Sequence, residues 1–221
     1  MVLAVALAHI EASVVVYLRE ALVDARAVFP DHLREPVPLL SKQQLQAASG
    51  NVPSLLGLEL VRELTALAVL AAAAVGFSRR RGEFGGMFLV GFGLWDIFYY
   101  VFLKAQIGWP ASLATWDVLF LIPVPWLAPV WAPLLVATTL TIAGLATLAR
   151  PVRRMSARSR LGCWIVILSG ACLILVSFCW RWRQGIGRMP ARFDWPWFMA
   201  GWILMVVGMV WMLSRPSRPR L

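Results

Sequence analysis

The hydrophobic positions of this chain are grouped into long apolar runs separated by short polar connectors. A transmembrane helix needs about 20 consecutive, mainly apolar residues. Five runs meet this requirement, and they cover residues 2–18, 57–78, 86–104, 161–180 and 195–213. The first run has no basic region before it, and His9 and Glu11 interrupt it, so we expect a mature span and not a secretory signal. The pattern therefore predicts five membrane-spanning helices.

A sixth apolar stretch, residues 113–149, is too long for one helix and contains several prolines. These are Pro123, Pro125, Pro129 and Pro133. Proline removes a backbone donor and clashes with the preceding turn, so a continuous helix is not expected here. We predict a short apolar half-helix over 113–122, an extended connection through PVPWLAP, and a span over about 133–149. The expected fold is an all-α polytopic transmembrane bundle of about six spans with a proline-broken fourth element.

Composition narrows the class of protein further. Hydrophobic residues make up 60% of the chain and charged residues 14%, with a mean hydropathy of +0.73. A soluble domain of this size could not cover its surface with so few polar groups. The net charge is +10, but the arginines gather in short connectors such as 78–81 and 150–160. That placement is typical of membrane topology signals and suits anionic headgroups, so we expect membrane lipids as partners and no nucleic acid.

We expect a single integral membrane domain over residues 1–221, with acid-bearing helices in 1–149 and a C-terminal helix pair in 150–221. If the N-terminus is cytoplasmic, the inside connectors hold eleven arginines in thirty residues, against nine Lys or Arg in sixty-five outside. This density favours cytoplasmic N- and C-termini. The basic stretch RWRQGIGR at 181–188 falls on the outside and runs against the rule.

Carboxylates inside the apolar runs are the main candidates for function. They are Glu11, Glu59, Glu63, Asp96 and Asp117. An ionised side chain at mid-bilayer costs roughly 2.5–3.5 kcal/mol, so such residues persist when they are paired, hydrated or useful. All five belong to the first four predicted elements. With the N-terminus inside, they would form an acidic funnel that opens to the outside.

Helical spacing groups these acids with other polar residues. Glu59 and Glu63 are four apart and share a helix face, with Arg62 adjacent to both. The simpler interpretation is an ion-paired cluster at the membrane interface. The full set of candidate substrate- or ion-binding residues is Asp96, Glu59, Glu63, Glu11, Asp117, Tyr99, Tyr100 and Arg62.

Asp96 is the strongest of these candidates, because it lies in the middle of a span with no cation nearby on its own helix. Tyr100 and Lys104 follow it along one stripe, and Tyr99 flanks it from the other side. We predict that Tyr99 or Tyr100 hydrogen-bonds Asp96. We also predict that Asp96 and Asp117 face one cavity, since the connector between their elements is short. Lys104 also fits an interface anchor.

A carboxylate metal site is a second hypothesis for the same region. Its candidate ligands are His9, Glu11, Glu59, Glu63 and Asp96, a set that would suit Zn, Mn or Fe. His9 and Glu11 are two residues apart and point to nearly opposite faces of a helix, so they cannot jointly bind one ion. The sequence holds no HExxH motif, no Gly-x-Ser-x-Gly and no phosphate-binding glycine loop. It identifies no cofactor.

Three phrases resemble a group of small, functionally uncharacterised bacterial polytopic membrane proteins. They are HIEASVVVYLRE at 9–20, LELVRELTA at 58–66, and WDIFYYVFLK with GWPASLATWDVLFLIPVPW at 95–126. The resemblance covers about a third of the chain, and its distinctive part is the long Trp-Asp phrase. It implies a location in the bacterial inner membrane and adds nothing on mechanism.

The leading functional hypothesis is proton- or cation-coupled transport through an outward-facing acidic cavity. Broken helices beside acidic groups are how secondary transporters build binding sites near the midplane. One alternative is an intramembrane enzyme that acts on a lipid or quinone, with a carboxylate as base or metal ligand. Another is an accessory subunit whose buried charges pair with a membrane protein partner or with a second copy of the chain.

Overall fold

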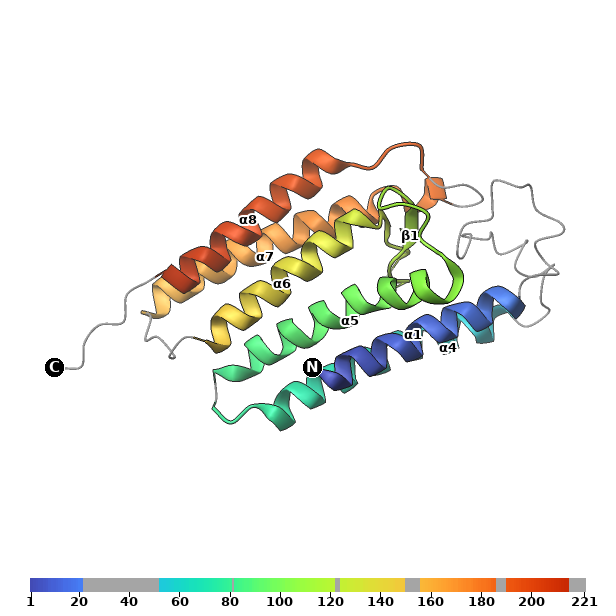
Figure 1. The fold of residues 1–221 in the computed structure, drawn as a ribbon. Coiled ribbons are helices and arrows are strands. Elements are labelled where there is room, and N and C mark those ends of the chain that lie inside the picture. The colour runs from blue at the N-terminus through green and yellow to red at the C-terminus, as the bar shows by residue number, and fades with distance from the viewer. Residues whose placement is uncertain (22–51, 81, 122–123, 150–155, 186–189, 215–221) are drawn as a thin grey trace.

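The computed structural model describes residues 1–21, 52–80, 82–121, 124–149, 156–185 and 190–214. Within these ranges the chain forms an elongated bundle of six long α-helices (Figure 1). The helices are α1 (Val2–Ala21), α4 (Val52–Phe77), α5 (Glu83–Ile107), α6 (Trp131–Leu148), α7 (Ala157–Cys179) and α8 (Trp195–Ser214). The predicted all-α polytopic bundle is confirmed.

Five of the helices in the described ranges are long and apolar enough to cross a membrane, by length and composition. The candidate spans are Leu60–Phe77, Glu83–Ile107, Trp131–Leu148, Ala157–Gln184 and Trp195–Ser214. The sixth helix, α1, contributes a shorter apolar stretch, Val2–Tyr17. A helix rises 1.5 Å per residue, so the five spans are of the length that a hydrocarbon core of about 30 Å requires. The chain is therefore a multi-pass membrane protein.

Successive helices run in alternating directions along the bundle (Figure 1). Helix α5 lies at the centre of the N-terminal part, where it contacts α1, α4 and α6. Helices α7 and α8 form a separate antiparallel pair that meets the rest through α6 and through residues Leu127–Pro129. Because six helices alternate, the start of α1 and the end of α8 lie at the same end of the bundle.

Small residues spaced seven apart allow the closest helix contacts. In α5, Gly86 and Gly93 lie against the backbone of α6, and in α8, Gly201 faces Gly170 of α7. A Cβ atom added at Gly170 would lie 2.5 Å from the carbonyl oxygen of Gly201. Within lipid, such close backbone approach is a main source of helix association. These contacts hold each antiparallel pair in a fixed register.

The predicted half-helix over 113–122 is wrong. The described part of this stretch is not helical, and it contains the strand β1 (Trp116–Val118), which pairs antiparallel with β2 (Leu127–Pro129). The predicted extended connection through PVPWLAP is confirmed where β2 is formed. Strand pairing supplies hydrogen bonds that a proline-interrupted helix would lack: the N–H of Leu119 donates to Trp126 O at 2.8 Å. The following helix, α6, begins at Trp131.

Residues 116–121 and 124–129, here called the re-entrant hairpin, fold back into the bundle. Phe120 packs against Trp95, which lies at the middle of α5, with ring centroids 6.2 Å apart. On the other side, Trp126 packs against Phe178 of α7 at 6.4 Å. Non-helical backbone at membrane depth is tolerated only where protein or water covers it. Here the helices α5 and α7 provide that cover.

Candidate functional site

Polar side chains from α1, α4, α5 and the re-entrant hairpin gather in the N-terminal part of the bundle. We call this group the intramembrane polar cluster; its members are Glu11, Arg62, Glu63, Asp96, Tyr99, Tyr100 and Asp117. Tyr99 lies within electrostatic range of four of them, namely Glu11, Arg62, Asp96 and Asp117. Four separate elements therefore bring their polar groups to one region.

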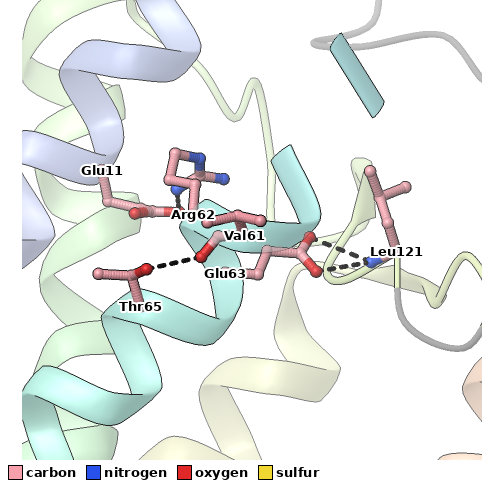
Figure 2. A network of polar contacts seen from close by, with 6 residues as sticks. All are labelled: Glu11, Val61, Arg62, Glu63, Thr65 and Leu121. Carbon is pink, nitrogen blue, oxygen red and sulfur yellow. Dashed lines mark hydrogen bonds and ion pairs between the residues drawn. The ribbon is translucent and has the colours of Figure 1, made fainter. Parts of the chain in front are cut away.

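An ion pair between Arg62 and Glu11 joins α4 to α1 (Figure 2). The side chains are 23% and 13% exposed, respectively. Sequence spacing placed Arg62 beside Glu59 and Glu63, but successive residues on a helix point about 100° apart, so adjacent side chains face different neighbours. Arg62 therefore reaches α1, where it neutralises an acid that would otherwise be costly inside lipid.

Glu63 binds the backbone of the re-entrant hairpin (Figure 2). Its side chain is 6% exposed, and the N–H of Leu121 donates to Oε1 at 3.1 Å and to Oε2 at 3.3 Å. Leu121 lies beyond the end of β1, so the antiparallel ladder does not extend to its N–H. A buried N–H without an acceptor costs about 1–3 kcal/mol. Glu63 thus anchors the hairpin to α4.

Asp117 makes the corresponding link between the hairpin and α5. It is 5% exposed, and the hydroxyl of Tyr100 donates to its Oδ2 at 2.8 Å. Its Oδ1 accepts the N–H of Val118 at 2.9 Å. The prediction that Tyr99 or Tyr100 bonds Asp96 is wrong for the described residues, because Tyr100 binds Asp117 instead. Two carboxylates, Glu63 and Asp117, therefore tie the hairpin to two different helices.

Asp96 differs from the other acids of the cluster. It is half-buried near the middle of α5, and among the described residues it makes no hydrogen bond and no ion pair. It lies one turn from Gly93, which touches α6, and one turn from Tyr100. Its charge is close enough to interact with that of Asp117. Asp96 thus lies beside a second carboxylate, and no cation among the described residues pairs with it.

The remaining candidates lie apart from the cluster or outside the description. Glu59 belongs to α4, but its side chain lies outside the described residues. His9 is exposed on α1, where its ring meets Phe102 edge-on at 5.0 Å. The ammonium group of Lys104 donates to the carbonyl oxygens of Gly108 and Pro110, at 2.9 and 2.8 Å. Lys104 therefore satisfies backbone acceptors at the end of α5.

The side chains that the structure describes do not form a metal centre. No three of their His, Cys, Asp and Glu groups lie close enough together to hold an ion. Two of the proposed ligands already have other partners, since Glu11 pairs with Arg62 and Glu63 accepts from Leu121. The metal hypothesis therefore has no support in this part of the chain.

Sequence reasoning missed one polar participant, the backbone N–H of Leu121. This N–H lies where the hairpin meets α4 and takes its acceptor from that helix, but residues 113–122 were expected to be helical. The Pro-Val-Pro sequence that follows was the available signal, because it excludes a regular helix there.

The chain matches no protein-family model, no curated protein and no solved structure.

Proposed function

We propose that this protein carries out proton- or cation-coupled transport, with Asp96 as the group that binds the coupling ion. The proposal rests on the position of Asp96 and on its lack of a described partner. It is a half-buried carboxyl at the middle of a membrane-spanning helix, without a hydrogen bond or an ion pair to any described residue. Ionisable residues in such positions are functional by default, because an idle charge there is expensive.

The partners of the other acids support a special role for Asp96. Glu11 is paired with Arg62, Glu63 holds the hairpin through Leu121, and Asp117 accepts from Tyr100. Each of these three acids takes part in a contact that links two elements of the bundle. Asp96 can gain or lose a proton or a cation without breaking a contact of that kind.

The re-entrant hairpin resembles the non-helical segments that line transporter sites near the midplane. It places Asp117 beside Asp96, so that two carboxylates share the region next to the broken element. Repulsion between the two negative charges favours uptake of one proton or cation. We further propose that the protein lies in a bacterial inner membrane, with the end of the bundle that carries the re-entrant hairpin on the outside.

Transport can be measured on purified protein reconstituted in lipid vesicles that contain a pH-sensitive dye. Under an imposed proton or monovalent-cation gradient, the wild-type protein is expected to change the internal pH, and Asp96→Asn is expected to abolish the change. Glu83→Gln is the matched control, because Glu83 lies at the first turn of α5, far from the cluster. Equal rates for wild type and Asp96→Asn, or a wild type that moves neither ion, would overturn the proposal.

A further inference from the structure

The arginine-rich connector between α7 and α8 has no part in the polar cluster, and it runs against the charge pattern expected of an external connector. Its described portion is held by a two-pronged ion pair. Arg181 donates from Nε to Asp194 Oδ2 at 2.6 Å and from Nη2 to Oδ1 at 2.7 Å. This ion pair joins the residues after α7 to those before α8, and Arg181 neutralises the charge of Asp194.

Aromatic packing fixes the same connector against the bundle. Phe193 packs on Phe178 of α7 at 6.1 Å and on Phe198 of α8 at 5.6 Å. The guanidinium of Arg183 lies over the ring of Trp182, 5.4 Å from its centroid. Phe193 therefore holds the backbone beside Arg192 against α7 and α8, and the ring of Trp182 supports the side chain of Arg183.

Two arginines close to the Arg181–Asp194 ion pair are exposed. Arg183 lies two residues after Arg181, in the 3-10 helix η2 (Trp182–Gly185), and Arg192 lies two residues before Asp194. The ion pair therefore brings both arginines to one turn, here taken as residues 181–185 and 190–194. Both side chains are exposed, and neither makes an ion pair or hydrogen bond with a described residue. The turn therefore presents two guanidinium groups without a described counter-charge.

Exposed indoles place this turn at the membrane surface. Trp180, Trp195 and Trp197 flank the connector, and their side chains are 74%, 61% and 60% exposed. Tryptophan is enriched where lipid headgroups meet hydrocarbon, because its ring is apolar and its N–H is polar. The two arginines that extend from the same turn then lie at the level of the headgroup phosphates.

We propose that Arg183 and Arg192 bind the phosphate of an anionic phospholipid, with the flanking indoles at the base of its headgroup. Guanidinium groups suit this ligand because they bind phosphate oxygens with paired, charge-assisted hydrogen bonds. An anionic lipid is favoured over a zwitterionic one because the turn carries positive charge that no described acid offsets. The site is independent of the proposed transport function.

The test uses the full-length protein in nanodiscs of phosphatidylcholine, with and without phosphatidylglycerol. Native mass spectrometry is expected to show phosphatidylglycerol retained in preference to phosphatidylcholine by the wild type. Each basic residue near a membrane surface contributes about 1 kcal/mol, so Arg183→Gln with Arg192→Gln should reduce this preference about thirtyfold. Arg158→Gln with Arg160→Gln removes the same charge at the start of α7 and should leave the preference intact.

A charge-preserving variant separates a phosphate site from general attraction. Arg183→Lys with Arg192→Lys should retain only part of the preference, because lysine cannot form the paired bonds. Equal losses in the Gln variants at the two ends of α7 would overturn the proposal. So would displacement of the bound lipid by inorganic phosphate, since the occupant would then be a free anion. Both Gln variants are expected to remain folded, because they leave Arg181 and Asp194 in place.

Discussion

At the scale of a single side chain, two neighbouring residues of α4 bind different partners because their side chains point in different directions. Arg62 reaches α1 and pairs with Glu11, whereas Glu63 turns to the hairpin and accepts from Leu121 (Figure 2). The apolar residues around Glu11 and Glu63 in the sequence indicated that both acids would be inside the bundle. The identity of their partners depends on which helices pack against α4, and helical spacing within one element carries no such information.

The role of Glu63 predicts a difference between two substitutions. Glu63→Gln keeps an oxygen that can accept the Leu121 N–H, so the protein should remain close to wild-type stability. Glu63→Leu leaves that N–H buried without its acceptor and should lower the free energy of unfolding by about 1–3 kcal/mol. Thermal unfolding of both variants in the same detergent measures the difference. If the two variants unfold together, Glu63 does not anchor the hairpin.

At the scale of whole elements, the long helices could be predicted from apolar length alone, but the hairpin could not. An apolar run of about ten residues is compatible with a short helix or with a buried strand, and periodicity does not separate the two. The proline-rich part beside Trp126 correctly excluded a continuous helix. The partnership of Asp117 with Tyr100 was missed for the same reason, because a helical 113–122 would orient Asp117 differently.

Helix pairing through glycine also gives a prediction at this scale. Gly170→Ala places a methyl group against the backbone of Gly201, so overpacking should destabilise the protein by about 1–3 kcal/mol. Gly57→Ala in α4 is the control, because an added Cβ there meets nothing within 4 Å. Alanine has a better helix propensity than glycine, so this control substitution should stabilise the protein by up to about 1 kcal/mol. Denaturation by sodium dodecyl sulfate would measure both, and equal effects would show that the α7–α8 contact tolerates expansion.

At the scale of the whole molecule, a group of arginines and the re-entrant hairpin lie towards opposite ends of the bundle. Arg79 and Arg80 follow α4, and Arg158 and Arg160 lie in the first turn of α7, so these arginines share one end. The re-entrant hairpin lies towards the opposite end (Figure 1). Basic residues next to spans are concentrated on the cytoplasmic side of membranes. The acidic region would then face outwards.

This orientation predicts the outcome of reporter fusions. A reporter fused after Arg81 should be cytoplasmic, and one inserted near Ser112 should be external, because basic connectors are retained inside. Alkaline phosphatase and a fluorescent protein report the two sides in complementary ways. Opposite labelling would place the polar cluster towards the cytoplasm and would contradict the proposed orientation of the bundle.

The proposed function requires that Asp96 exchanges a proton or a cation within the membrane. Infrared difference spectra of reconstituted protein, recorded across steps in external pH and cation concentration, test it most directly. We predict a carboxyl signal that disappears in Asp96→Asn and persists in Glu63→Gln, because Glu63 is bound to the hairpin and Asp96 has no described partner. Spectra of Asp96→Asn that match those of the wild type would contradict the claim.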